Sequence, residues 1–115
     1  MTAVQPAADL DPEDAKIITL ARSARARTRA PEGAAVRDAT GRTYAAVSVA
    51  LPSLKLSALE AAVAMAVSSG ADRLEAAAIV SEVTELTDAD VAVALDLKAG
   101  AVFLAAPDGS VVTRR

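Results

Sequence analysis

The side chains that could do chemistry in this chain are hydroxyls, carboxylates and amines, because none of its 115 residues is histidine or cysteine. The candidates for a reactive site lie in two segments, residues 55–70 (KLSALEAAVAMAVSSG) and 87–99 (TDADVAVALDLKA). Ser57 has no histidine to activate it, and Lys55 or Lys98 could act as a base only if burial lowered its pKa. A hydrolytic enzyme that relies on these groups is therefore the least favoured function.

Both segments carry the spacing of a capped helix start. In a capping box, the Ser57 hydroxyl accepts the backbone N–H of Glu60, and the Glu60 carboxylate accepts the N–H of Ser57. Thr87 and Asp90 have the same spacing, so we predict helix caps at all four positions, each cap contributing roughly 1 kcal/mol. Two helix starts that face one cavity could instead attract an anion, but these caps already consume the N–H groups that an anion would need.

The later acidic residues have two interpretations. Asp88, Asp90 and Asp96 could form a carboxylate site for Mg²⁺. Acidic residues in the first turn of a helix more commonly complement the helix dipole. We therefore predict no metal and no cofactor from this cluster.

Four arginines crowd the end of the first predicted helix: Arg22, Arg25, Arg27 and Arg29. They are predicted to complement the helix dipole and to form solvated surface. Contact with an acidic partner or with another subunit is the alternative.

Composition and charge exclude several classes of function. With 12 basic and 15 acidic residues, the net charge of −3 offers no basic excess to attract a phosphate backbone, which disfavours nucleic acid as a partner. The N-terminus lacks the features of a signal peptide, and no apolar run approaches the ~20 residues that span a bilayer. Since there is also no cysteine for a disulfide framework, we expect a cytoplasmic protein without a membrane partner.

The hydropathy pattern predicts a single domain over residues 11–115 and a flexible tail over residues 1–10. Asp11 is the predicted N-cap of the first helix. The further elements are a hairpin over 33–51 that turns at Thr40–Gly41 and is broken by Pro52 and Ser53, a helix over 58–70, a strand over 73–83, a helix over 87–99, and two strands within 101–112 around a turn at Asp108–Gly109. This order predicts an α/β fold, a three-layer α-β-α sandwich with a mixed five-stranded sheet.

Two features of the core bear on assembly. The helix over 58–70 is apolar on nearly every face, which predicts that it is covered on all sides. Tyr44 and Phe103 are the only aromatic residues, so the core consists of small aliphatic side chains that each bury little area. We expect such a domain to gain stability by burying surface between subunits.

With its elements in this order, the chain resembles the cytidine deaminase family from about Ala21 to its C-terminus. The residues that carry the resemblance are Gly33, Ala34 and Ala35 in the first strand, Gly41 in the turn, Val47 and Val49 in the next strand, and Ala58, Ala61, Ala62, Ala66, Val67 and Gly70 in the alanine-rich helix. The resemblance implies the family's α/β fold and a dimer or tetramer.

The family's reactive groups are missing at the matching positions. The resemblance places a zinc ligand at Ser57 and the catalytic glutamate at Leu59. It places the later pair of zinc ligands at Thr87 and Asp90, and the two groups that grip the nucleoside at Ser48 and Ala50. Zinc deaminases hold the metal with histidine and cysteine and move the proton with a glutamate. The metal is needed because it lowers the pKa of bound water to about 7. We therefore predict a zinc-free pseudoenzyme without a cofactor.

The predicted function is structural: an interaction module that forms a homodimer or homotetramer, with another cytosolic protein as a further candidate partner. Such a module predicts a filled former active site and an exposed apolar patch. The alternative is non-catalytic binding of a nucleoside, nucleotide or other anion at that site, which predicts an open pocket of roughly a few hundred Å³ with convergent donors. A hydrolase or deaminase that acts on a nucleoside without zinc is the third hypothesis.

Overall fold

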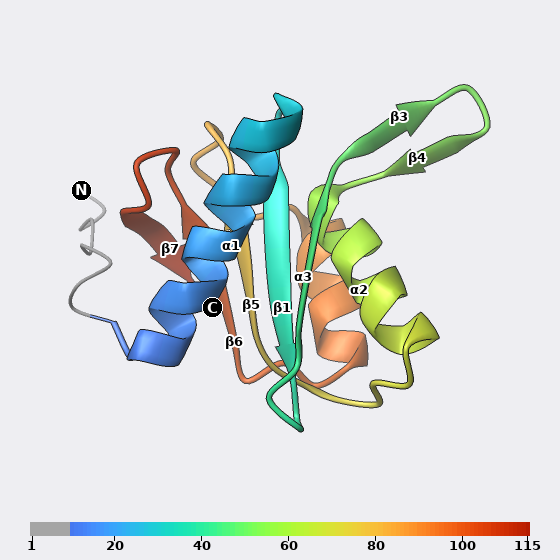
Figure 1. The fold of residues 1–115 in the computed structure, drawn as a ribbon, viewed down its shortest axis with the longest axis vertical. Helices are drawn as coiled ribbons and strands as arrows, with labels where there is room; N and C mark the ends of the chain where they lie inside the picture. Colours follow the sequence, from blue (N-terminus) through green and yellow to red (C-terminus); the bar gives the residue numbers. More distant parts are fainter. Residues whose placement is uncertain (1–9) are drawn as a thin grey trace.

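The computed structural model describes residues 10–115, so the predicted flexible tail lies outside the described residues except for Leu10. The elements in chain order are α1 (Pro12–Thr28), β1 (Gly33–Asp38), β2 (Thr43–Val47), β3 (Val49–Leu51), β4 (Leu54–Leu56), α2 (Ala58–Ser68), β5 (Leu74–Val80), α3 (Asp88–Asp96), β6 (Ala101–Ala105) and β7 (Val111–Arg114) (Figure 1).

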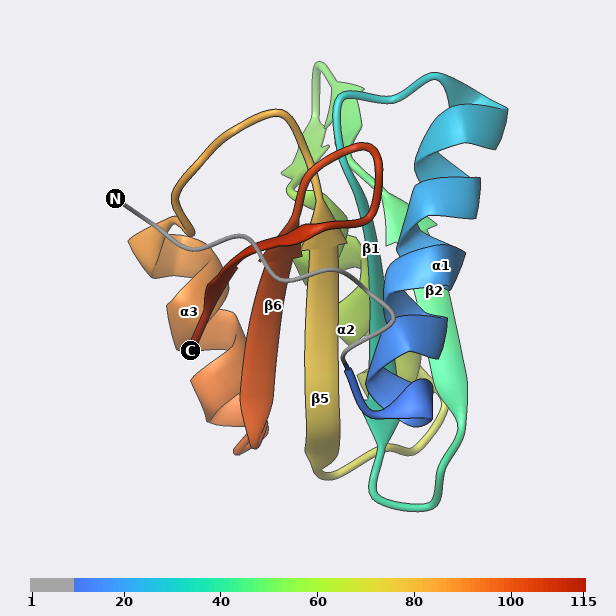
Figure 2. The same cartoon turned by 90° about the vertical axis from the view of Figure 1, so that its left-hand side faces the viewer.

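Five of the strands form one mixed sheet in the order β2-β1-β5-β6-β7. The β5–β6 pair is parallel, and the other three pairs are antiparallel. α1 covers one face of the sheet, while α2 and α3 cover the other (Figure 2). The predicted three-layer sandwich with a mixed five-stranded sheet is therefore confirmed.

The alternation of side chains along β5 explains why both faces are covered. Ala77 and Ile79 pack into the cluster below α2 and α3, whereas Ala76, Ala78 and Val80 pack below α1. Successive side chains of a strand point to opposite faces, so a continuous apolar run needs helices on both sides.

α1 lies unusually close to the sheet where it crosses the start of β1. A Cβ atom at Gly33 would lie 2.1 Å from the carbonyl oxygen of Ala21, which no real structure tolerates. The apolar stripe of this helix is buried throughout: Ile17, Ile18, Ala21 and Ala24. At its start, the Asp11 carboxylate accepts the N–H of Glu13 at 2.9 Å. The helix ends at Thr28, and Arg29 follows with a left-handed φ of 58°.

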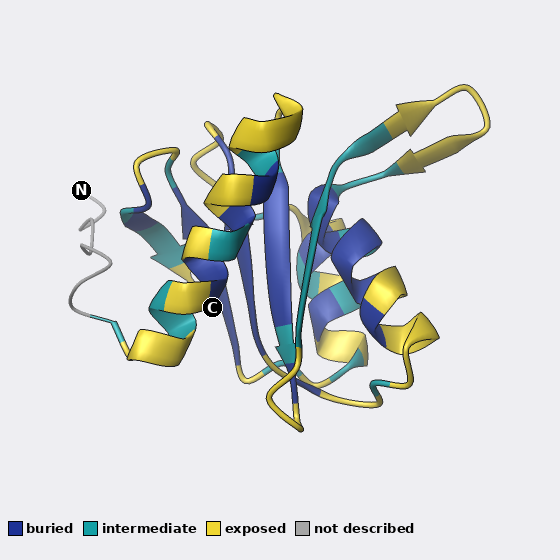
Figure 3. Cartoon of the chain, in the orientation of Figure 1, coloured by how far each residue is buried: buried dark blue, intermediate teal, exposed yellow. Residues whose placement is uncertain are grey.

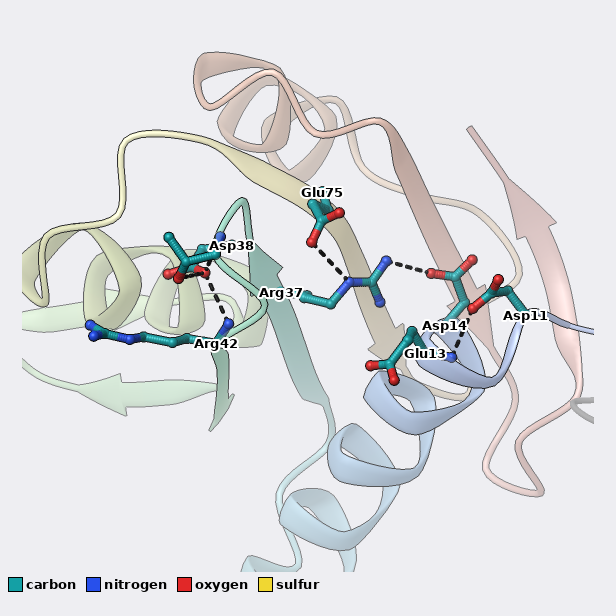
Figure 4. A network of polar contacts seen from close by, with 8 residues as sticks. Asp11, Glu13, Asp14, Arg37, Asp38, Arg42 and Glu75 are labelled. Atoms are coloured by element: carbon teal, nitrogen blue, oxygen red, sulfur yellow. Dashed lines mark hydrogen bonds and ion pairs between the residues drawn. The ribbon is translucent and has the colours of Figure 1, made fainter.

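The turn between β1 and β2 is organised by one carboxylate. Asp38 Oδ1 accepts hydrogen bonds from the N–H and hydroxyl of Thr40 and from the N–H of Arg42, at 2.7 to 3.0 Å (Figure 4). Tyr44 donates to the other carboxylate oxygen at 3.3 Å. The hairpin turn predicted around Thr40–Gly41 is confirmed.

The strand after this turn is shorter than predicted. β2 ends at Val47, and the chain then forms a second hairpin, β3–β4, in which Pro52 and Ser53 make the turn rather than the break. This hairpin extends away from the sandwich (Figure 1). Its strands of three residues are too short to stand out in the hydropathy pattern, because strand signals need about four or more residues.

Within one chain, α2 is not covered on every face as its apolar pattern predicts. Ala58, Leu59, Ala61, Ala62, Val63 and Ala66 face the interior. Met65 and Val67 are 46 % and 49 % exposed, and the outward side of the helix is exposed in Figure 3. The reason is positional: α2 packs against the sheet and α3, and nothing in the described chain lies on its other side.

None of the helices in residues 10–115 is long and apolar enough to cross a membrane.

Candidate functional site

The starts of α2 and α3 meet at one point. Ser57 is the N-cap of α2, and its Oγ accepts the N–H of Glu60 at 3.0 Å. Glu60 Oε1 accepts the N–H of Ser57 at 2.8 Å, which completes a capping box. These two side chains therefore satisfy two backbone donors that the helix start would otherwise leave unpaired.

The start of α3 is capped differently from the prediction. Thr87 Oγ1 accepts the N–H of Asp90 at 3.1 Å, as expected of a cap. The Asp90 carboxylate, however, does not reach back to Thr87. Its Oδ1 accepts a hydrogen bond of 2.6 Å from the Ser57 hydroxyl, which joins the two helix starts directly. Asp90 is 3 % exposed, and a buried carboxylate gains from the short hydrogen bond that the half-buried Ser57 hydroxyl donates.

A third acidic group beside this joint, Glu32, was missed by the sequence analysis. It precedes β1, and its Oε1 accepts the N–H of Ala58 at 3.4 Å. Partial burial raises the pKa of Glu32, the hydrogen bond from Ala58 opposes this, and the negative charge of Asp90 adds a smaller increase. No local pattern marks this residue, because only the packing of α2 beside the start of β1 brings it to Ala58.

Glu32, Ser57 and Glu60 line one edge of an open groove of about 580 Å³. The β3–β4 hairpin and the loop after β5 form its other walls, and its surface is mainly apolar. Four of the predicted site residues line this groove: Ser48, Ala50, Ser57 and Glu60. Asp90 lies behind Ser57, to which it is bonded. Thr87 is exposed and does not line the groove.

Leu59 is placed elsewhere. It is completely buried, in the core cluster between α2 and the sheet. An aliphatic side chain in this position stabilises the sandwich by burial, and it cannot transfer a proton. The position therefore contributes to the fold rather than to the groove.

The other predicted reactive groups do not come together. Asp88 lies at the start of α3 and Asp96 at its end, and both are exposed. Across residues 10–115, no group of three histidine, cysteine, aspartate or glutamate side chains is placed to hold a metal ion. Lys55 and Lys98 are both exposed.

A second polar cluster lies at the opposite end of the sheet (Figure 4). Arg37 Nη2 bonds Asp14 Oδ1 of α1 at 3.0 Å, and its Nε lies 3.5 Å from Glu75 Oε1 of β5. The side chain of Arg37 is 12 % exposed. This arrangement ties the first turn of α1 to the sheet. The buried Nη1 of Arg37 has no hydrogen-bond partner within residues 10–115.

Comparison with known proteins agrees with this architecture. The family described as cytidine deaminase-like matches residues 10–109. The cytidine deaminase from Burkholderia pseudomallei is 23 % identical, with a TM-score of 0.72 over 87 % of this chain and 89 % of that chain. The cytidine deaminase from Mycobacterium leprae is 21 % identical, with a TM-score of 0.66 over 89 % and 95 % of the two chains. No curated protein matches the sequence. These structures share the fold, and the chain belongs to the cytidine deaminase-like family.

Proposed function

We propose that this protein is a non-catalytic member of its family, with a structural or interaction role that it performs as an assembly of identical subunits. The hydrogen bond between Ser57 and Asp90 carries this proposal. It occupies the point between two helix starts where the resemblance to cytidine deaminases would place a zinc ion.

The groups at this point do not fit such an ion. Two oxygen ligands of a tetrahedral zinc, each about 2.1 Å from the metal, lie roughly 3.4 Å apart. The facing oxygens of Ser57 and Asp90 are only 2.6 Å apart, because the hydroxyl of Ser57 donates a hydrogen bond to the carboxylate. The sequence supplies no imidazole or thiolate that could replace them. With Leu59 buried in the core, the position that matches the catalytic glutamate also lacks a group that could move a proton.

The β3–β4 hairpin supports a role in assembly. Its strands pair only with each other, and a two-stranded ribbon is marginally stable in water without further packing. Leu51 and Leu54 flank its turn and are 55 % and 48 % exposed. Met65 and Val67 expose a further apolar surface on α2. A second copy of the chain that covered the hairpin would remove Leu51 and Leu54 from water and would stabilise the two-stranded hairpin.

Two measurements test the proposal. Purified protein supplied with zinc is assayed for conversion of cytidine to uridine, and its mass is followed by analytical ultracentrifugation over a range of concentrations. We expect no turnover above a mock purification and a mass of two or four subunits. Turnover that Ser57→Ala abolishes would refute the loss of catalysis. A mass of one subunit at every concentration would refute the assembly.

One observation favours a second candidate function, the binding of a nucleoside without turnover. The groove is large enough for such a ligand, and it presents hydroxyl and carboxylate groups from Ser48, Glu32 and Glu60. Since Glu32, Glu60 and the nearby Asp90 are acidic, their charges disfavour the anion considered from the sequence and favour a neutral ligand with N–H donors.

A thermal-shift series distinguishes this function from assembly alone. Cytidine and uridine are expected to raise the melting temperature, whereas their monophosphates have a smaller effect. A ligand at 100 times its Kd adds about 2.7 kcal/mol of stability. Glu32→Gln should change the response to cytidine without changing the oligomeric mass. An unchanged melting temperature with all four compounds would exclude this function.

A further inference from the structure

We propose that Arg22 and Arg25 form a binding site for a small oxyanion, either inorganic phosphate or the phosphate group of a monoester, on the α1 side of the sheet. The site is separate from the groove between β3–β4 and α2. It gives a role to two of the four arginines that crowd the end of α1.

The two arginines line a cavity of about 250 Å³ together with Thr19, Ser23, Val80 and Pro107. A tetrahedral oxyanion and several waters fit this volume, since each water occupies roughly 30 Å³. Val80 ends β5, and Pro107 follows shortly after β6. The cavity therefore lies beyond the carboxyl ends of the parallel β5–β6 pair, the part of α/β sheets where ligands bind preferentially.

Each guanidinium is held by a backbone carbonyl through a single nitrogen. Arg22 Nε donates to the carbonyl of Pro107 at 3.0 Å, and Arg25 Nε donates to the carbonyl of Pro31 at 3.1 Å. A guanidinium has five N–H donors in a planar fork, so the four donors on the two Nη atoms of each arginine are left for a ligand. Paired guanidinium forks are well suited to phosphate oxygens.

The backbone approaches both arginines closely at two glycines, although Arg22 is exposed. An added Cβ at Gly109 would lie 3.1 Å from Cδ of Arg22, so the turn before β7 lies directly against that side chain. An added Cβ at Gly33 would lie 3.0 Å from Cβ of Arg25. The side chain of Arg25 is only 24 % exposed. Such preorganised side chains lose little further conformational freedom when a ligand binds.

Two acidic groups lie near the arginines, and Glu82 competes only weakly. Glu82 Oε1 lies 3.8 Å from Arg25 Nη2, and the side chain of Glu82 is 84 % exposed, which describes a loose pair that an anion can displace. Asp108 Oδ1 accepts the N–H and the hydroxyl of Ser110, at 2.8 and 2.6 Å. These bonds and, to a smaller degree, the charge of Arg22 lower the pKa of Asp108, so an anion must compete with this carboxylate for Arg22. Arg27 and Arg29 add positive charge at the end of the same helix without lining the cavity.

The test is a titration of the ¹⁵N-labelled full chain with inorganic phosphate and, separately, with glycerol 3-phosphate, at constant ionic strength and followed by NMR. We expect saturable shifts of the Nε–H signals of Arg22 and Arg25 with both ligands. Tighter binding of glycerol 3-phosphate would identify a phosphate monoester as the ligand, and equal binding would identify the phosphate group alone.

Variants separate a built site from general attraction. Arg22→Gln and Arg25→Gln should each weaken binding by roughly tenfold, because each removes charged hydrogen-bond donors. Arg27→Gln, which removes the same charge from the same helix, should change binding by less than about twofold. Glu82→Gln should tighten binding, and this result remains informative if Arg25→Gln fails to fold. Absence of saturable shifts, or equal weakening by Arg27→Gln and Arg22→Gln, would overturn the proposal.

Discussion

The hydroxyl of Ser57 donates a hydrogen bond of 2.6 Å to Oδ1 of Asp90, a residue 33 positions further along the chain. One side chain begins α2 and the other lies in the first turn of α3, so this single contact fixes how the two helices begin beside each other. A short bond to an ionised acceptor is stronger than one between neutral groups. The two helix starts are thus joined directly by their side chains.

Replacing Ser57 by alanine should destabilise the fold by about 2–4 kcal/mol. The change removes a helix cap, which contributes about 1 kcal/mol, and leaves the buried Asp90 carboxylate without its donor, which costs about 1–3 kcal/mol. Urea unfolding measures the difference. Ser53→Ala, in the exposed turn of the β3–β4 hairpin, is the matched control and should stay within about 0.5 kcal/mol of the wild type.

A double-mutant cycle isolates the contact itself. Ser57→Ala and Asp90→Ala, made singly and together, should show a coupling free energy of about 1 kcal/mol or more, since both residues belong to one hydrogen bond. Additive effects would mean that the two helix starts are stabilised independently.

The exposed leucines of the hairpin should determine the oligomeric state. Leu51→Ser with Leu54→Ser should shift the assembly towards single subunits in analytical ultracentrifugation, because the variant no longer gains by burying these side chains. Leu95→Ser is the control: Leu95 is 62 % exposed but lies near the end of α3, away from the helix start that meets Ser57. Circular dichroism should be unchanged in both variants. If Leu95→Ser dissociates the assembly and the hairpin variant does not, the interface lies elsewhere.

Glu32 should make the fold less stable as the pH rises from acid to neutral. Burial, and to a smaller degree the charge of Asp90, raises the pKa of Glu32 above its ordinary value of 4.5. Between pH 4.5 and the raised pKa, the unfolded chain has released this proton while the folded chain still holds it, so ionisation favours unfolding. Glu32→Gln removes this penalty and still accepts the N–H of Ala58.

The expected result is a higher melting temperature for Glu32→Gln than for the wild type at pH 7, with the difference vanishing below about pH 4.5. Glu85→Gln, which alters an exposed carboxylate in the loop before α3, serves as the control for lost surface charge. An advantage of Glu32→Gln that persists at pH 3 would contradict the assignment to ionisation.

Gly33 should be the glycine least tolerant of a side chain. In Gly33→Ala the methyl group would meet the Ala21 carbonyl at 2.1 Å, so α1 must move off the sheet, at an expected cost of about 3 kcal/mol or more. Gly41→Ala is the matched control. Its Cβ would meet nothing within 4 Å, and only its φ of 89° opposes the change, by about 1–2 kcal/mol. Equal destabilisation of the two variants in urea would show that α1 can shift without loss.

Much of the architecture could be predicted because it depends on neighbours in sequence. The buried stripe of Ile17 and Ile18 and the apolar run of β5 follow from periodicity. The cap at Ser57 depends on residues three positions apart. The turn around Gly41 carries a glycine with positive φ next to short polar residues. The β3–β4 hairpin could not be predicted, because its three-residue strands give no periodic signal and its stability comes from packing.

The sequence by itself determined three properties of this protein: the absence of histidine and cysteine, the order of the helices and strands of the sandwich, and the capped helix starts. Only the tertiary structure decided which distant groups meet: Ala58 with Glu32 across 26 residues, Ser57 with Asp90 across 33, and Arg22 with Pro107 across 85. Local hydrogen bonds and periodic burial act within a few residues, and so they are written into short stretches of sequence. Contacts over longer separations depend on strand register and on how closely the helices approach the sheet, and these are settled only when the whole core packs.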